Sequence, residues 1–148
     1  MSQQSDTVKQ AQNAFEEMRF AEEFIASIRA ELSECLGLEG IEALPMYFRS
    51  PVAMPAKVGI AKNLVARFQI SDEQAIKKLK LILSRYFQSD QYHAAMQNMS
   101  QRYSLDMEVR GTLSDDEKRH YRIKSKARAK KREEKELRRA QRKARLQE

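Results

Sequence analysis

The sequence predicts a mainly α-helical protein with one small β-hairpin, and three observations support that fold class. Residues 7–36 contain neither glycine nor proline and repeat apolar side chains at steps of three and four residues. Two serines further along are each followed three residues later by Gln or Glu, which is the spacing of a helix capping box. The stretch "RYSLDMEVRG" alternates apolar and polar residues, as a strand or tight hairpin does. We expect a compact helical domain over residues 41–125 with a long helical extension at each end.

The first extension, residues 1–40, is predicted to be acidic and amphipathic. Its helix over residues 7–36 carries one apolar stripe, formed by Phe15, Met18, Ala21, Ile25, Ile28, Leu32 and Cys35. Glutamates occupy the other faces of this helix. In the simplest interpretation the stripe packs on the domain core. The alternative is a docking surface for a second copy of the chain or for the basic tail.

Residues 54–64, "MPAKVGIAKNL", are predicted to form a tight entry into a helix. We expect Gly59 to let backbone segments come close at a crowded helix start. Val58 and Ile60 would then enter the core, and Lys57 would project into solvent. The residue-level alternative is a tight turn with an incidental lysine.

A second helix is predicted to begin near Asp72, capped reciprocally by Ser71 and Gln74. Its core stripe is formed by Ile76, Leu79, Leu83 and Tyr86, and its adjacent polar face by Lys77, Lys80 and Ser84. A solvated face is the usual role of such lysines. The alternative role of these lysines is to bind phosphate groups.

The last helix is predicted to begin near Asp115, because Ser114 and Glu117 form the second capping box. Residues 126–148 form a basic tail, helical or disordered, that we expect to fray toward its end. From Glu117 to Glu148 the chain has 15 Lys and Arg against five Asp and Glu, a balance of +10 that leaves −3 for residues 1–116. This asymmetry favours a polyanion as partner, most often nucleic acid; a solvated tail is the alternative.

The sequence argues against an enzyme and predicts no cofactor or metal. It contains no glycine-rich phosphate loop, nucleophile elbow or paired-histidine motif. The single Cys35 cannot form an internal disulfide, and with only His93 and His120 beside it there is no zinc-binding pattern. No apolar run is long enough to span a membrane, and residues 1–20 lack a secretory signal, so we expect a cytoplasmic protein.

Residues that suit nucleic-acid binding lie between positions 57 and 110. Lys57, Lys80 and Arg102 supply cations, Tyr92 and Tyr103 supply rings, and Ser89 marks a helix start whose N–H groups can face an anion. Tyr86 and Tyr103 fall on predicted core stripes, so packing explains them better. Tyr92 lies among polar neighbours and is the stronger candidate for contact with a nucleotide.

The order of these signals resembles the ProQ/FinO domain of bacterial RNA chaperones over roughly residues 44–125. The motifs, in order, are "LPMYF", "PAKVGI" opening a helix, "YFQSDQY" closing another, "RYSLD" as a strand, and "GTLSDDEKRHY" starting the last helix. The resemblance implies a compact helical domain that binds the base of a terminator-like RNA hairpin and its single-stranded 3′ tail on a concave basic surface.

The resemblance also implies roles for individual residues. Lys57 matches the RNA-contacting lysine of the family signature, Tyr92 a tyrosine at a helix junction, and Arg102 the arginine that opens the strand. Ser89 falls where the family begins the helix that holds the 3′ end, and Lys80 where a helical arginine faces the duplex. The full predicted RNA-binding set is Lys57, Lys77, Lys80, Arg85, Ser89, Tyr92 and Arg102.

Some positions depart from the family pattern. Ser84 and Gln91 stand where relatives often have basic side chains, and Asp90 adds a negative charge near the expected 3′-end pocket. Met107 replaces the glycine that commonly follows the strand's aspartate. Two other function classes stay open: a non-catalytic protein-interaction or ribosome-associated module, and a DNA-binding protein with a basic helix in the major groove.

Overall fold

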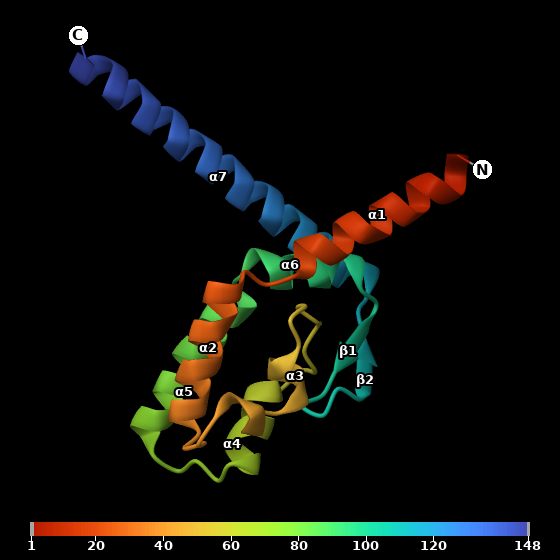
Figure 1. The fold of residues 1–148 in the computed structure, drawn as a ribbon, viewed down its shortest axis with the longest axis vertical. Helices are drawn as coiled ribbons and strands as arrows, with labels where there is room; N and C mark the ends of the chain where they lie inside the picture. Colours follow the sequence, from red (N-terminus) through yellow and green to blue (C-terminus); the bar gives the residue numbers. More distant parts are fainter. Residues whose placement is uncertain (1, 148) are drawn as a thin grey trace.

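The computed structural model describes the backbone of residues 2–147 and the side chains of residues 8–147. Within that range the chain forms seven α-helices, one short 3-10 helix and a two-stranded antiparallel hairpin, so the predicted fold class is confirmed. The elements are α1 (Ser2–Met18), α2 (Glu22–Cys35), a 3-10 turn (Ile41–Ala43), α3 (Met46–Arg49), α4 (Ile60–Arg67), α5 (Glu73–Phe87), α6 (Asp90–Asn98), β1 (Gln101–Tyr103), β2 (Val109–Thr112) and α7 (Asp115–Gln147). Helices α1 and α7 leave the body of the domain in different directions (Figure 1).

The prediction of one continuous helix over residues 7–36 is wrong, because the chain breaks between Met18 and Glu22. The cause lies far away in sequence. Phe20 is buried in the core, and its N–H donates to the carbonyl of Pro51 at 3.0 Å. The N–H of Ala53 donates to the carbonyl of Met18 at 2.8 Å. Residues 18–20 therefore pair with an extended segment instead of with the next helical turn.

The break divides the predicted apolar stripe between two environments. Ile25, Ile28 and Leu32 of α2 are buried, and α2 packs on α5. Phe15 of α1 stays 44% exposed. The simpler interpretation thus applies to α2, whereas docking of another chain or of the tail on α1 stays a prediction. The division of the chain at residues 40 and 125 also stays a prediction.

Helix α5 supplies much of the core. Leu79, Leu83 and Tyr86 of the predicted stripe are buried, and Tyr86 packs against several aromatic rings of the core. The predicted reciprocal cap is wrong, because Asp72 and not Ser71 caps the helix. The Asp72 carboxylate accepts the N–H of Gln74 at 3.2 Å. Asp and Ser are nearly equivalent caps, so a one-residue shift costs little.

The entry into α4 differs from the prediction in its physical cause. Gly59 has φ +82° and ψ +19°, a left-handed conformation that strongly favours glycine. A Cβ built on Gly59 would meet nothing within 4 Å, so backbone crowding does not explain the residue. Ile60 is buried as expected, but Val58 is 76% exposed and the prediction that it enters the core is wrong.

The predicted hairpin is confirmed and has a third neighbour. Strand β1 pairs with β2, with a register shift between Gln101 and Tyr103. On its other side, the N–H of Tyr103 donates to Pro55 at 2.9 Å and its carbonyl accepts the N–H of Lys57 at 2.8 Å. These bonds place residues 55–57 beside Arg102. Met107 in the turn has φ +62°, a left-handed conformation that favours glycine, which fits the expectation of glycine at this position.

Helix α7 begins with the predicted capping box. The N–H of Glu117 donates to the Ser114 hydroxyl at 3.1 Å, and the Ser114 N–H donates to the Glu117 carboxylate at 3.4 Å. The helix continues to Gln147, so the described part of the basic tail is helical. None of its described residues is buried. Its first part packs on α6, and beyond that contact the helix extends away from the body of the domain (Figure 1).

Gln69→Gly is expected to raise the free energy of unfolding by about 0.5–1 kcal/mol. Helix α4 ends in a Schellman motif, in which the Ile70 N–H donates to Val65 and the Gln69 N–H to Ala66. Gln69 has φ +50°, a conformation that costs an ordinary residue energy and glycine almost none. Urea unfolding measures the change, and Gln69→Ala is the control. A lower stability of the glycine variant would contradict this account.

Candidate functional site

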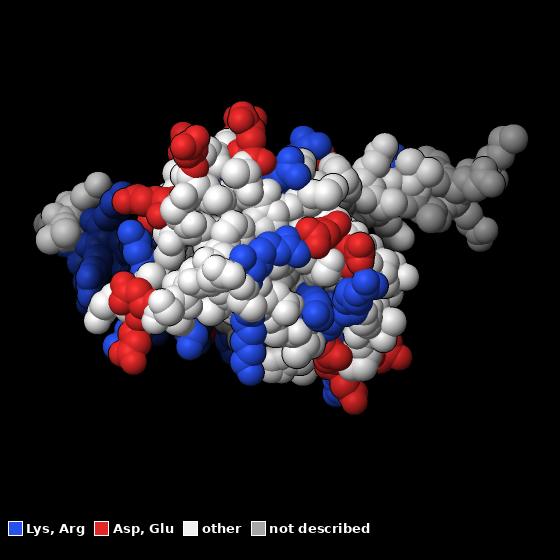
Figure 2. Space-filling model, turned by 90° about the horizontal axis from the view of Figure 1, so that it is seen from below, with Lys and Arg blue, Asp and Glu red and all other residues white. Residues whose placement is uncertain are grey.

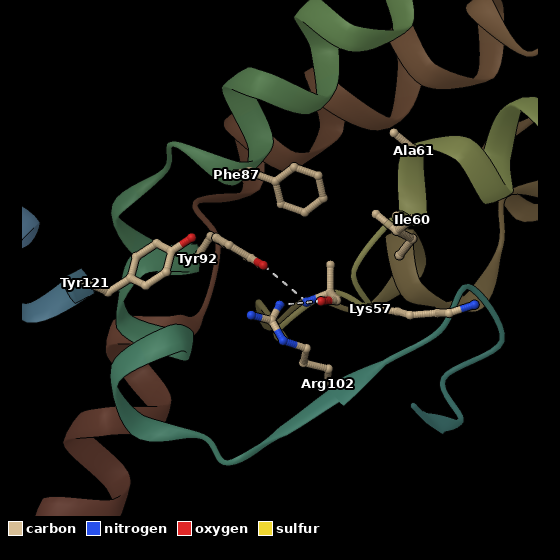
Figure 3. A pocket seen from close by; sticks show the side chains of 9 residues that line it. Lys57, Ile60, Ala61, Phe87, Tyr92, Arg102 and Tyr121 are labelled. Carbon is tan, nitrogen blue, oxygen red and sulfur yellow. Dashed lines mark hydrogen bonds between the residues drawn. The ribbon is translucent and has the colours of Figure 1, made fainter. Parts of the chain in front are cut away.

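A pocket of about 340 Å³ lies where β1, the start of α4 and helices α5, α6 and α7 meet, and we call it the Arg102 pocket (Figure 3). It contains two cations and three aromatic rings. Its lining residues are Ala56, Lys57, Gly59, Ile60, Ala61, Phe87, Tyr92, Arg102 and Tyr121. The tertiary fold thus gathers these groups from separate segments between residues 56 and 121.

Arg102 is the most constrained cation of the pocket. Its side chain is 13% exposed, donates to the Ala56 carbonyl at 2.8 Å and forms an ion pair with Glu117 at the start of α7. The hydrogen bond from Arg102 holds the pKa of Glu117 below its ordinary value. A guanidinium has five N–H donors, so these two partners leave donors free for a further anion. Glu117 is 42% exposed and can be displaced by one.

Tyr92 forms the floor of the pocket. Its hydroxyl accepts the N–H of Ala56 at 3.2 Å, while Arg102 holds the carbonyl of the same residue, so the two side chains fix one peptide segment from both sides (Figure 3). Burial raises the pKa of Tyr92 to about 12. The ring is only 4% exposed, which leaves little of its face for a nucleotide.

The more accessible rings are those of Phe87 and Tyr121, which both lie half-buried at the rim. Phe87 packs edge-on to Tyr92 with ring centroids 4.9 Å apart, and Tyr121 does so at 6.4 Å. Lys57 lies on the side of the pocket opposite Tyr121, and its amino group points away from Arg102 (Figure 3). The pocket therefore presents aromatic surface on one side of Arg102 and a lysine on the other.

The model of the ProQ/FINO family matches residues 31–140 of the chain. The chain belongs to the ProQ/FINO family. No curated protein sequence gave a significant match. Among solved structures, a FinO-like RNA chaperone from Neisseria meningitidis is similar, with 16% sequence identity and a TM-score of 0.47 over 82% of this chain and 89% of that one.

The ProQ/FINO match spans the parts of the chain that build the Arg102 pocket. Of the seven predicted site residues, the structure brings Lys57, Tyr92 and Arg102 together there. Ser89 lies just outside, where its hydroxyl caps α6 by accepting the N–H of Tyr92 at 3.2 Å and donates to the Tyr86 carbonyl at 2.7 Å. Its position at the helix start is as expected, and its hydroxyl is already used by the fold.

The three predicted residues of α5 lie elsewhere. Lys80 lines a largely apolar groove of about 500 Å³ between α4 and α5, together with Lys62 of α4. Lys77 is exposed on the same helix. Arg85 forms an ion pair of 2.5 Å with Glu31 of α2. The face of the domain seen in Figure 2 intersperses Lys and Arg with Asp and Glu.

Sequence reasoning missed Phe87, Glu117 and Tyr121 as parts of this site. Phe87 and Tyr121 occur inside motifs that carry the family resemblance, "YFQSDQY" and "GTLSDDEKRHY", and that was the available signal. The pairing of Glu117 with Arg102 joins residues 15 positions apart and has no local signature.

The described residues also bear on metal binding and on membrane insertion. No group of three His, Cys, Asp or Glu side chains within that part of the chain is arranged to hold a metal ion. None of the helices it contains combines the length and apolar character needed to cross a bilayer.

Proposed function

We propose that this protein is a cytoplasmic, non-catalytic RNA chaperone that binds structured RNAs at a terminator-like hairpin followed by a single-stranded 3′ tail. In this role it protects the 3′ ends of small RNAs and promotes their pairing with other RNAs in post-transcriptional regulation. The proposal rests on membership of the ProQ/FINO family and on one observation. That observation is a pocket in which a partly buried arginine lies between accessible rings and a lysine.

The chemistry of the Arg102 pocket suits the end of an RNA strand. The free 3′-hydroxyl of the strand and its last phosphate can accept hydrogen bonds from the free donors of Arg102, and the phosphate can compete with Glu117 for the others. The terminal base can pack on Phe87 or Tyr121, since stacking on an aromatic ring does not depend on base identity. Buried Tyr92 holds Ala56 and so keeps the pocket in shape.

The hairpin stem would be recognised by shape. An A-form helix presents phosphates and 2′-hydroxyls rather than a readable major groove, so cations at fixed spacing select the fold of the RNA and not its sequence. Lys57 at the pocket and Lys80 and Lys77 on α5 are the cations that we assign to the stem. The basic α7 would then sample a second RNA by charge alone.

The test is the affinity of the whole chain for a hairpin with a short U-rich 3′ tail, compared with the same RNA carrying a blocked 3′ end. Loss of a hydrogen bond to a charged group costs about 1.5–3 kcal/mol, so we expect blocking to weaken binding at least about tenfold. Fluorescence anisotropy at several salt concentrations measures both the affinity and its electrostatic share.

A duplex DNA competitor completes the experiment. We expect duplex DNA to displace the hairpin only at low salt, because the duplex offers phosphates but no single-stranded 3′ tail. Equal affinity for free and blocked ends, together with efficient competition by DNA, would contradict the proposal. Binding would then come from the charge of α7 alone, and the protein-interaction module would be the better assignment.

A further inference from the structure

A second pocket, of about 350 Å³, lies between α6 and α7, and we call it the His93 pocket. It lies outside the set of residues that the sequence predicted to bind RNA. Its lining residues are Gln88, His93, Lys124, Ala127, Arg128 and Lys131.

Three cations of α7 point into the His93 pocket from one face of the helix. Lys124, Arg128 and Lys131 follow one another at steps of four and three residues, which places them on the same side. The remaining lining residues are His93, Gln88 and Ala127, so no acidic side chain lines the pocket. Such an arrangement is suited to an anion.

His93 forms a buried wall of the pocket. It is 5% exposed, and Arg128 Nη1 lies 3.3 Å from both ring nitrogens, which puts the guanidinium over the face of the ring. Burial lowers the pKa of His93, and the charges of Arg128 and Lys124 lower it further, while Asp90 opposes them. The imidazole is therefore neutral near pH 7, and the positive charge of the pocket comes from α7.

The α7 arginines already hold an internal carboxylate beside this pocket. Asp90, the first residue of α6, lies 2.8 Å from Arg132 and 3.8 Å from Arg128. The Asp90 side chain is 53% exposed, so solvent screens the pairs and an incoming anion can replace the carboxylate. The same relation holds in the Arg102 pocket, where Glu117 is bound to Arg102.

Tyr121 lies between the two pockets, because it lines the Arg102 pocket and contacts two residues that line the His93 pocket. Its ring lines the Arg102 pocket, packs on Tyr92 with centroids 6.4 Å apart and meets the His93 ring edge-on at 5.1 Å. Lys124 lies over the same ring, with its amino group 5.9 Å from the centroid. The two cationic sites are thus neighbours along α7, separated by one aromatic side chain.

We propose that the His93 pocket binds a backbone phosphate of the same RNA strand whose 3′ end occupies the Arg102 pocket. The inference rests on the proposed function and extends it. The strand crosses Tyr121, places one phosphate against Lys124, Arg128 and Lys131, and displaces Asp90 from the arginines. The adjacency of the two pockets favours RNA as the ligand over an acidic protein segment.

The test compares two double variants with equal loss of charge. Lys124→Gln with Lys131→Gln removes two cations of the pocket, while Lys135→Gln with Lys143→Gln removes two exposed lysines farther along α7. Each lost phosphate contact lowers the slope of log affinity against log salt by about 0.7 for single strands. We expect the pocket variant to weaken hairpin binding and flatten this slope clearly more than the control variant does.

Asp90→Asn supplies the opposite change. It frees Arg128 and Arg132, so we expect tighter binding and a steeper salt dependence, with the thermal midpoint as a check that the fold is retained. Equal effects of the two double variants, or weaker binding by Asp90→Asn, would overturn the inference. The inference would also be overturned if a poly-glutamate peptide bound the protein and its binding depended on Lys124 and Lys131 as strongly as RNA binding does.

The two proposals fail separately in this design. If the wild-type chain discriminates between free and blocked 3′ ends but the double variants behave alike, only the assignment of the His93 pocket is overturned. If the wild-type chain does not discriminate, the proposed function is contradicted, and the inference that depends on it is overturned as well.

Discussion

Arg102→Ala is expected to weaken binding of a hairpin RNA with a free 3′ tail by about ten- to a hundredfold, as expected for lost hydrogen bonds to a charged group. The same change should abolish the preference for a free 3′ end. Arg102 is 13% exposed and is held by Ala56 and Glu117, so its guanidinium is fixed in one position in the pocket. An RNA with a blocked end already lacks this contact, and the two losses should therefore overlap instead of adding.

Two variants control this result. Arg110→Ala removes an arginine from the neighbouring strand, where the side chain is 56% exposed and contacts the nearby Glu108 and the carbonyl of Val109. It should change affinity only slightly and keep the end preference. Glu117→Gln can still cap α7 but removes the carboxylate charge bound to Arg102, so it should tighten binding. Equal affinities of Arg102→Ala and Arg110→Ala would contradict the assignment of the pocket.

Tyr86→Ala is expected to lower the free energy of unfolding by about 3–5 kcal/mol, the range for removing a large buried aromatic ring. Tyr86 is fully buried at the centre of the aromatic core. Its ring centroid lies 5.0–6.2 Å from those of Phe20, Tyr47, Phe48, Phe87 and Tyr92. These rings come from the break between α1 and α2, from α3 and from α5 and α6. The cavity would therefore loosen contacts between several elements at once.

Urea unfolding followed by circular dichroism measures this loss, and Tyr86→Phe is the matched control. The phenylalanine variant keeps the ring and should stay within about 1.5 kcal/mol of the wild type, since it changes only one hydroxyl. A cost below 1.5 kcal/mol for Tyr86→Ala would contradict the central place of this residue. Because Phe87 and Tyr92 also line the Arg102 pocket, Tyr86→Ala should weaken RNA binding even where the protein is still folded.

Features that depend on residues close in sequence could be predicted. The capping box of Ser114 and Glu117, the core stripe of α5 and the hairpin at "RYSLDMEVRG" each need only a few neighbouring positions. The predictions that failed depend on distant partners. Nothing within residues 7–36 shows that Phe20 will bond to Pro51 and end a helix that lacks both glycine and proline. Val58 has an apolar side chain, yet the fold leaves that side chain exposed to solvent.

The same division holds for the candidate site. Lys57, Tyr92 and Arg102 were selected from residue type and from motifs, and the fold brings them to one pocket. The sequence did not show that Tyr92 is buried or that Glu117 is bound to Arg102. It also did not show that Asp90 pairs with arginines some 40 positions away on α7. Those facts change the roles that the residues can play, because a buried ring supports a pocket and a paired arginine must exchange its partner to bind an anion.

The sequence by itself determined that this chain is mainly helical, that its positive charge lies near the carboxyl end, and where its hairpin and last helix begin. Periodicity, caps and net charge are local or additive properties, so they can be read along the chain. Only the tertiary structure decided where the first helix breaks, which rings are exposed and which carboxylates hold the arginines of the two pockets. Those outcomes depend on competition between distant segments for the same core positions and hydrogen bonds. The two residues of each such contact lie far apart in the chain, so no local sequence pattern reveals them.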